Sequence, residues 1–421
     1  MQVTLHSPAP GGTVRAFPSK SEAHRYLICA SLADAPTHIV CNATNDDIDA
    51  TISCLCALGA SITRTEDGYD VTPIAHAPEH ADLDVRESGS TLRFLLPVLA
   101  ALGTHARFTR RGRLPERPLA PLDTLLEQHG ASIRNTEILE ISGQLCGNDY
   151  TIAANVSSQF ISGLLFALPW LNSPVDCTVR PAGQIESRPY LDMTLASLAA
   201  FGICVREQDG VLTIPAHSRY RSPGCLTVGG DWSGAAAFAC MGAVGKHPIT
   251  LTGLDTQSVQ GDRAVLDVLA HMGAQIRVTP TKITVTPAPL RGAEIDATHI
   301  PDLVPVLAAT AALANGTTRI CGAARLRLKE SDRLATTTAV LRTLGADIRE
   351  TEDGLLITGK PTLLGGAVQA FGDHRIAMTA AVASLGCTDA VQIDGAQAVA
   401  KSYPTFWEQL AALSAPDSVK F

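Results

Sequence analysis

The sequence predicts an α/β protein made of six similar copies, because two features recur along its 421 residues. The first is a glycine at the end of an amphipathic segment, found at Gly59, Gly130, Gly202, Gly273 and Gly345, with intervals of 71, 72, 71 and 72 residues. The second is a small or polar cluster that opens an Ala/Leu-rich segment, and it occurs six times. Self-similarity at a fixed period is typical of repeat architectures.

The glycines predict where one helix of each copy ends. They lie in LCALGASI, LLEQHGASI, SLAAFGICV, VLAHMGAQI and LRTLGADI, where an amphipathic segment changes to an alternating β-branched run. Glycine is favoured just after a helix because it adopts the left-handed backbone conformation without strain. A turn and a second strand follow, as in SITRTEDGYDVTPI, CVREQDGVLTIP and DIRETEDGLLITG. The last helix, FWEQLAAL, ends where a sixth glycine would fall.

The polar clusters predict a second helix in each copy, apolar on nearly every side. They read PSKSEAHR, RESGSTLR, NVSSQF, GDWSGAAAF, IPDLVPVL and FGDHRIAM. A helix that is apolar on all sides must be surrounded by other parts of the protein, so we predict helices inside and sheets outside. Each copy is predicted to consist of a strand, an apolar helix, a strand, an amphipathic helix and a β-hairpin. The repeat alone leaves open one ring, two lobes of three copies, or a solenoid binding protein. The different chemistry of each cluster argues against the solenoid.

Composition excludes several classes of protein. Lys+Arg 33 against Asp+Glu 41 gives a net charge of −8, so no diffuse positive field would attract nucleic acid or an anionic membrane. The longest apolar stretches are much shorter than the roughly eighteen residues of a membrane span. The start, MQVTLHSPAPGG, has no secretory signal pattern, so a cytoplasmic protein is expected. The eleven cysteines are scattered without metal or redox spacing, and we interpret them as buried free thiols.

Cationic residues concentrate beside the predicted helix starts. Helix amino termini carry partial positive charge and unpaired N–H groups, so several of them converging would bind an anion. For one cluster alone, N-caps and solvated arginines explain the pattern better. Together, the clusters favour a ligand set with several phosphate or carboxylate groups held by arginine. No GxxxxGK[ST], GxGxxG, HExxH or GxSxG pattern supports a nucleotide site, a zinc site or a serine nucleophile.

Eight ordered motifs give the sequence a family resemblance. They are SKSEAHR, SGSTLR, RLPERP, VSSQF, SRPY, LKESDR, DHRIAM and AKSYP, and together they resemble the 5-enolpyruvylshikimate-3-phosphate synthase family over nearly the whole chain. The resemblance implies a two-lobed inside-out α/β barrel of six βαβαββ repeats, three per lobe, which closes on its ligands. Residues 17–228 would form an N-terminal lobe that mainly binds shikimate-3-phosphate. Residues 1–16 plus 229–421 would form a C-terminal lobe for phosphoenolpyruvate and catalysis.

The resemblance also implies an activity and a set of site residues. The family transfers the enolpyruvyl group of phosphoenolpyruvate to the 5-hydroxyl of shikimate-3-phosphate on the route to chorismate, without metal or cofactor. The resemblance also implies that glyphosate is an inhibitor. We expect the protein to be a monomer. Shikimate-3-phosphate would contact Lys20, Ser21, Arg25, Ser157, Ser158, Gln159, Ser187, Tyr190, Asp302 and Lys329. Phosphoenolpyruvate would contact Lys20, Gly89, Arg113, Gln159, Arg333, Arg375 and Lys401. The implied catalytic residues are Asp302 as base on the hydroxyl, Glu330 and Lys401 as candidates for proton exchange at carbon, and Lys20.

Two departures from the family pattern and two alternatives bear on this interpretation. Glu87-Ser88 stands where the family often has Asn-Ala, and Arg325 stands where many members have Asn. The runner-up is the enolpyruvyl transferase that acts on UDP-N-acetylglucosamine, but that family uses Lys-Asn at Lys20-Ser21 and a loop cysteine that is lacking here. A catalytically dead scaffold protein would have lost its acid and base residues, and they are present in this chain.

Overall fold

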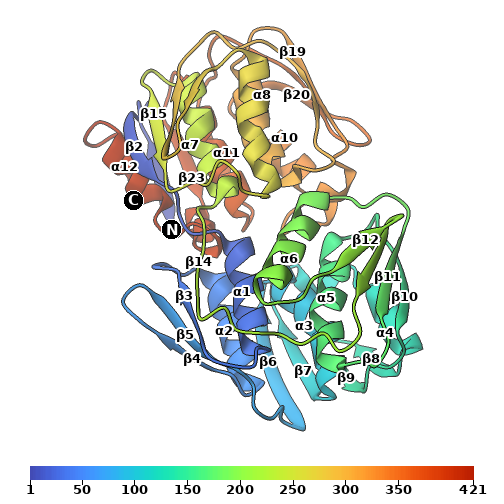
Figure 1. Cartoon of the computed structure of the whole chain (residues 1–421). Helices are drawn as coiled ribbons and strands as arrows, with labels where there is room; N and C mark the ends of the chain where they lie inside the picture. The colour runs from blue at the N-terminus through green and yellow to red at the C-terminus, as the bar shows by residue number, and fades with distance from the viewer. The chain divides into compact units, whose positions relative to one another are not determined.

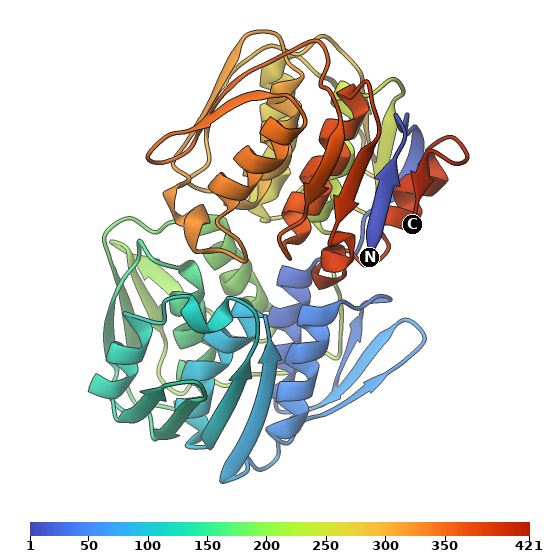
Figure 2. The ribbon, with the colours of Figure 1, turned by 180° about the vertical axis from the view of Figure 1, so that it is seen from behind.

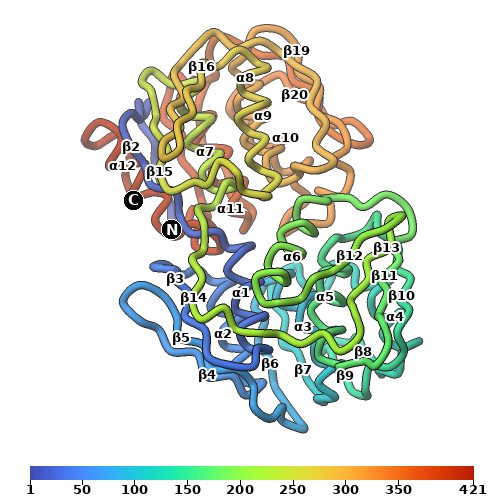
Figure 3. The backbone as a smooth tube through the Cα atoms, viewed as in Figure 1, coloured from blue at the N-terminus to red at the C-terminus, as the bar shows by residue number.

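The computed structural model describes all of residues 1–421 and divides into two compact units. We call Pro18–Val228 the N-terminal lobe, and Met1–Phe17 together with Gly229–Phe421 the C-terminal lobe. The backbone therefore passes between the lobes twice, and its course can be followed by colour in Figure 3.

The N-terminal lobe contains three four-stranded sheets, ordered β14-β3-β5-β4, β6-β7-β9-β8 and β10-β11-β13-β12. The first two strands of each sheet are parallel and the other neighbours are antiparallel. The strands are β3 (Thr37–Val40), β4 (Ser61–Arg64), β5 (Gly68–Thr72), β6 (His80–Arg86), β7 (His105–Arg110), β8 (Ala131–Asn135), β9 (Leu139–Gly143), β10 (Asp149–Ala153), β11 (Cys177–Ala182), β12 (Arg206–Gln208), β13 (Val211–Ile214) and β14 (Cys225–Thr227). The helices are α1 (Lys20–Ser31), α2 (Asp46–Ala57), α3 (Gly89–Leu102), α4 (Leu122–Gln128), α5 (Ser158–Ala167) and α6 (Arg188–Ala200).

The C-terminal lobe repeats this pattern in sheets ordered β2-β15-β17-β16, β18-β19-β21-β20 and β22-β23-β1-β24. The strands are β1 (Gln2–Leu5), β2 (Gly12–Arg15), β15 (Ile249–Thr252), β16 (Gln275–Val278), β17 (Lys282–Thr286), β18 (Glu294–Asp296), β19 (Thr317–Cys321), β20 (Asp347–Glu350), β21 (Leu355–Thr358), β22 (Gly366–Gln369), β23 (Val391–Asp394) and β24 (Val419–Lys420). The helices are α7 (Trp232–Val244), α8 (Val265–Met272), α9 (Val304–Ala312), α10 (Arg333–Thr343), α11 (His374–Ala383) and α12 (Phe406–Leu413). Short 3-10 helices include η3 (Gly261–Ala264), η4 (Pro301–Leu303), η5 (Ala324–Leu328) and η7 (Ala396–Lys401).

The helices that open with the polar clusters lie inside each lobe. Every residue of α9 and of α11 is buried, as is nearly every residue of α3, α5 and α7. Figure 1 shows α1, α3 and α5 side by side, with the strands of their lobe around them. Small residues allow this close packing: a Cβ on Gly163 of α5 would lie 2.4 Å from the carbonyl oxygen of Arg93 on α3. The predicted layering of helices inside and sheets outside follows from these apolar surfaces.

The five repeat glycines end their helices as predicted. Gly59, Gly130, Gly202, Gly273 and Gly345 all have positive φ. Each follows the last turn of an outer helix, where a residue with a Cβ would be strained.

The copies are less regular at their edges than the sequence predicts. The amino-terminal segment forms two strands rather than one: β1 pairs antiparallel with β23, and β2 pairs parallel with β15. Figure 2 shows β1, in blue, beside the red strands from the other end of the chain. Likewise β14 completes the sheet of β3. Such exchanges cover edges that consecutive strands alone would leave unpaired. None of the helices has both the length and the apolar character that crossing a membrane requires.

Candidate active site

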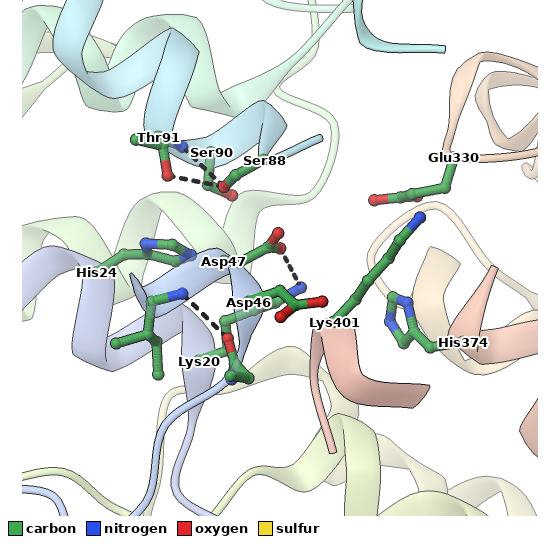
Figure 4. A network of polar contacts seen from close by, with 12 residues as sticks. Lys20, His24, Asp46, Asp47, Ser88, Ser90, Thr91, Glu330, His374 and Lys401 are labelled. Carbon is green, nitrogen blue, oxygen red and sulfur yellow. Dashed lines mark hydrogen bonds and ion pairs between the residues drawn. The ribbon is translucent and has the colours of Figure 1, made fainter. Parts of the chain in front are cut away.

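The start of α1 presents an ammonium group held by a carboxylate. Ser19 caps this helix by accepting a hydrogen bond from the Glu22 N–H, so Lys20 occupies the first helical position. The Lys20 Nζ lies 2.9 Å from Oδ2 of Asp47, in the first turn of α2, and both side chains are mostly buried (Figure 4). The ion pair fixes the direction of the Lys20 side chain.

Arg25, one turn further along α1, is buried and connects α1 to α6. Its guanidinium donates to the Ser21 carbonyl at 2.6 Å, the Tyr190 carbonyl at 2.8 Å and Oγ1 of Thr194 at 3.0 Å. No carboxylate is among these partners, and burial lowers the pKa of Arg25 to about 10. Arg25 therefore brings Ser21 and Tyr190 together and adds net positive charge to this part of the lobe.

The start of α3 carries a second cationic group. Arg93 Nη1 donates to Oε1 of Gln159 at 2.9 Å, and Gln159 Nε2 donates to Oγ of Ser90 at 2.9 Å. A Cβ on Gly89 would lie 2.8 Å from Nη1 of Arg117 and 3.0 Å from Nη1 of Arg93. Two guanidinium groups therefore flank the first residue of a helix, an arrangement that favours an anion.

The remaining predicted residues of the N-terminal lobe differ in exposure. Ser157 caps α5 by accepting from the Gln159 N–H, and Ser158 is buried. Ser187 precedes α6 with φ 53°, an uncommon conformation for a residue other than glycine. Arg113 is largely exposed, and its Nε lies 3.4 Å from Oε2 of Glu116.

Arg333 organises the acid and base residues of the C-terminal lobe. It is buried, and its guanidinium contacts Asp302 at 2.7 Å, Asp373 at 2.8 Å and Glu330 at 2.9 Å. Burial works to lower the pKa of Arg333, but the three carboxylates raise it well above its usual value. Each carboxylate is thereby held in one orientation by a permanent cation.

Asp302 is a partner of cations and not a helix cap. It lies within η4, and no side chain caps η4 or the following α9. Its Oδ1 also lies 3.7 Å from Nζ of Lys329, whose pKa is lowered by burial. The capping interpretation open to Asp302 from sequence is therefore wrong.

Two further cations of this lobe are fixed by main-chain carbonyls. Arg375 is the second residue of α11 and donates from its guanidinium to the Ser233 carbonyl at 2.7 Å, while its main-chain N–H donates to Oδ1 of Asp373. Lys401 Nζ donates to the Gly372 carbonyl at 2.6 Å, and its side chain runs toward Glu330 in Figure 4. Glu330 and Lys401, the candidates for proton exchange at carbon, therefore lie near each other in this lobe.

Sequence reasoning missed several carboxylates that complete this arrangement. Asp47 pairs with Lys20, Asp373 binds Arg333, and Asp262 of η3 accepts a hydrogen bond from the Ser233 hydroxyl. Burial first, and then the charge of Asp302, raise the pKa of Asp262 to about 7. Only Asp373 had a sequence signal, since it stands in the DHR cluster.

The structure shows where the two departures noted in the sequence lie. The Glu87 carboxylate lies against Gly112, where a Cβ would be 2.5 Å from its Oε1. The Arg325 guanidinium donates to the Thr298 carbonyl at 2.6 Å and so connects η5 to the segment after β18.

Comparison with known proteins decides the family. A family model described as EPSP synthase (3-phosphoshikimate 1-carboxyvinyltransferase) matches residues 8–410. The chain belongs to this family. It is 42% identical over 419 residues to a 3-phosphoshikimate 1-carboxyvinyltransferase of Clostridium kluyveri, covering 98% of this chain and 97% of that protein. A protein of the same name from Methanocorpusculum labreanum is 37% identical over 423 residues, with 99% of each chain covered.

Solved structures agree on the fold. EPSP synthase from Acinetobacter baumannii is similar with a TM-score of 0.82 and 26% identity, covering 100% of this chain and 99% of that one. The enolpyruvyl transferase NikO from Streptomyces tendae shares the fold, with a TM-score of 0.77 at 19% identity and coverage of 100% and 98%. The family and the α/β fold class predicted from the motifs are confirmed.

Proposed function

We propose that the residues described above carry out enolpyruvyl transfer in this chain, each by binding or activating one part of two anionic substrates. The chain is a 3-phosphoshikimate 1-carboxyvinyltransferase: it transfers the enolpyruvyl group of phosphoenolpyruvate to shikimate-3-phosphate in aromatic amino-acid biosynthesis. In this proposal the 5-hydroxyl adds to C2 of phosphoenolpyruvate, an enol phosphate, while the methylene carbon gains a proton; loss of that proton with phosphate then gives the enol ether product.

Shikimate-3-phosphate would be bound mainly by the N-terminal lobe. Ser21, Arg25 and Tyr190 form one group there because Arg25 hydrogen-bonds the other two residues. The full proposed set is Lys20, Ser21, Arg25, Ser157, Ser158, Gln159, Ser187 and Tyr190, together with Asp302 and Lys329 of the C-terminal lobe. Hydroxyls and amides suit a ligand with several hydroxyl groups, and the cations suit its phosphate.

Phosphoenolpyruvate would be bound mainly by cations. The proposed set is Lys20, Gly89, Arg113, Gln159, Arg333, Arg375 and Lys401. The observation that supports it best in the N-terminal lobe is the pair of guanidinium groups beside Gly89, because they flank a helix start that carries no Cβ. In this proposal Arg113 would exchange its exposed contact with Glu116 for the ligand.

Asp302 is the proposed base. Addition removes a proton from the hydroxyl oxygen and adds one to the methylene carbon, and elimination reverses the exchange at carbon. The contact of Asp302 with both Arg333 and Lys329 carries this assignment, since two cations hold a carboxylate ready to accept a proton from a neighbouring hydroxyl. Glu330 and Lys401 would move the proton at carbon.

One assay tests the activity directly. Phosphate release from phosphoenolpyruvate should require shikimate-3-phosphate and should not occur with UDP-N-acetylglucosamine as the only acceptor. Release with the second acceptor alone would contradict the proposed substrate. Lys20→Met should lower the rate in the same assay without unfolding the chain, because Lys20 lies at a helix start and not in the apolar core.

Three finer points belong to the proposal. Glyphosate should compete with phosphoenolpyruvate, since it is an anion that the same cations would bind. We also propose that the protein works as a monomer in the cytoplasm. Its eleven cysteines are all free thiols, which fits a reducing compartment. The interpretation of all of them as buried is wrong, because four are exposed.

A further inference from the structure

A chain of four buried polar side chains crosses the interior of the N-terminal lobe. Nδ1 of His24 on α1 lies 2.6 Å from Oγ1 of Thr51 on α2, which lies 2.7 Å from Oγ1 of Thr91 on α3. The Thr91 hydroxyl donates to Oγ of Ser88 at 2.7 Å. We call these four residues the His24 relay. None of the four is more than 1% exposed.

The direction of the hydrogen bonds follows from counting protons. A hydroxyl has one proton to donate, and Thr91 uses its proton on Ser88. Thr51 must therefore donate to Thr91, and His24 must donate to Thr51 from a protonated Nδ1. The imidazole is then the neutral Nδ1–H tautomer, and its Nε2 is a buried acceptor without a hydrogen-bond partner. Burial, and then the charges of Lys20 and Arg25, hold the pKa of His24 well below its usual value, which keeps this form.

The relay ends at the cap of α3. Ser88 is the N-cap, and its Oγ also accepts the Thr91 N–H, as the two dashed lines between these residues in Figure 4 show. The next residue, Gly89, is one that the proposed function gives to the phosphoenolpyruvate site, and Ser90 accepts a hydrogen bond from Gln159 of the same proposed site. Any displacement of Ser88 would move them directly.

The relay begins one turn below Lys20. His24 and Thr51 are the fourth residues after Lys20 and Asp47, so α1 and α2 are joined twice, by the ion pair at their starts and by the hydrogen bond one turn deeper. Stability alone does not call for this arrangement. Replacing buried hydrogen-bonded partners by apolar groups of the same shape is often neutral or stabilising. What a buried hydrogen-bonded network adds is a specific geometry of the groups that it joins.

We infer that the His24 relay is a positioning device that fixes the start of α3, with Gly89 and Ser90, against the start of α1, with Lys20. The inference rests on the proposed phosphoenolpyruvate site and adds residues that do not touch the ligand. His24, Thr51 and Thr91 are positioning residues, and they act through Ser88.

Threonine-to-valine variants test the relay, because valine keeps the shape of threonine and removes the hydroxyl. Thr51→Val and Thr91→Val should each raise the KM for phosphoenolpyruvate about five- to twentyfold in the phosphate-release assay. The double variant should be no worse than the worse single variant, because one broken link already interrupts the relay. The KM for shikimate-3-phosphate should change less than twofold in Thr91→Val, which leaves α1 untouched.

Thr104 offers a matched control near the other end of α3. Thr104 is 1% exposed, and its hydroxyl donates to the Pro78 carbonyl at 2.9 Å. Thr104→Val should lower the melting temperature as much as Thr51→Val does and leave both KM values within twofold of the parent. If the relay variants behave like this control, the relay is merely structural and the inference is wrong. Multiplying effects in the double variant would also overturn it.

Conservative variants keep the test decisive if a valine variant fails to fold. Thr51→Ser keeps the hydroxyl, and His24→Asn keeps an N–H donor where Nδ1 lies, so both should retain the parent KM, whereas His24→Leu should raise it. Equal effects of His24→Asn and His24→Leu would overturn the inference. A parent enzyme that releases no phosphate from the two substrates would instead refute the proposed function, so the two failures are distinguishable.

Discussion

Gly89→Ala should crowd the proposed anion site without destabilising the fold. The new Cβ would lie 2.8 Å from Nη1 of Arg117, 3.1 Å from its Cζ and 3.0 Å from Nη1 of Arg93. Arg93 is held by Gln159 and by the Pro118 carbonyl. The atom nearest the new Cβ belongs to the far end of the flexible Arg117 side chain, so we expect Arg117 to shift. A shift of several tenths of an ångström would withdraw its charge from the start of α3.

The magnitude follows from the contact that is lost. A hydrogen bond to a charged group contributes about 1.5–3 kcal/mol, so weakening one contact to the phosphate should raise the KM for phosphoenolpyruvate roughly 10- to 100-fold. Glyphosate is longer than phosphoenolpyruvate and should lose more affinity. The fold should not suffer, because Gly89 has no left-handed φ and alanine favours a helix by up to about 1 kcal/mol over glycine.

Three measurements on Gly89→Ala check this reasoning: the KM for phosphoenolpyruvate, the inhibition constant of glyphosate and the melting temperature. The contrast is Gly163→Ala, whose Cβ would meet the Arg93 carbonyl oxygen at 2.4 Å and should destabilise the fold. A Gly89→Ala enzyme with parental KM, or with glyphosate affinity reduced no more than substrate affinity, would refute the proposed crowding.

The other predictions concern carboxylates. Asp302→Asn should bind both substrates and lose on the order of a hundredfold or more in kcat, because the amide cannot accept the hydroxyl proton; near-parental kcat would exclude Asp302 as the base. Asp47→Asn should raise both KM values severalfold through the loss of the Lys20 ion pair, and unchanged values would contradict that. The raised pKa of Asp262, about 7, means that the folded chain keeps a proton that the unfolded chain loses near pH 4, so this group costs stability as pH rises. The unfolding free energy of Asp262→Asn minus that of the parent, from urea titrations, should therefore grow by about 2 to 3 kcal/mol from pH 5 to pH 8, and a constant difference would refute the shift.

Local patterns made most of the fold predictable. Gly59 and Gly345 are identifiable because an amphipathic run, a glycine and a β-branched run follow one another within a few residues, and both have the expected positive φ. The pairings of β1, β2 and β14 were not predictable in this way. These strands have only three or four residues, and the strands that they pair with lie far away along the chain. One partner of β1, the strand β24, lies at the other end of the chain.

The basic residues of the candidate site were more predictable from the sequence than its acidic residues. Lys20 and Arg375 stand beside capping residues, and lysine and arginine are few enough for such positions to be noticed. Asp47 and Asp262 are two among 41 acidic residues, and their roles depend on partners brought near only by folding. Asp302 could equally have been a cap until its contact with Arg333 was known.

The two lobes hold their arginines in different ways, and the difference has an electrostatic consequence. Arg25 bonds two main-chain carbonyls and a hydroxyl, and no carboxylate is among these hydrogen-bond partners. Arg333 bonds three carboxylates, so its neighbourhood gains no net positive charge but contains acid and base groups in fixed orientations. Neutral partners suit a lobe that attracts phosphate, and carboxylate partners suit one that transfers protons. This contrast favours the proposal that the N-terminal lobe mainly binds shikimate-3-phosphate and the C-terminal lobe provides catalysis.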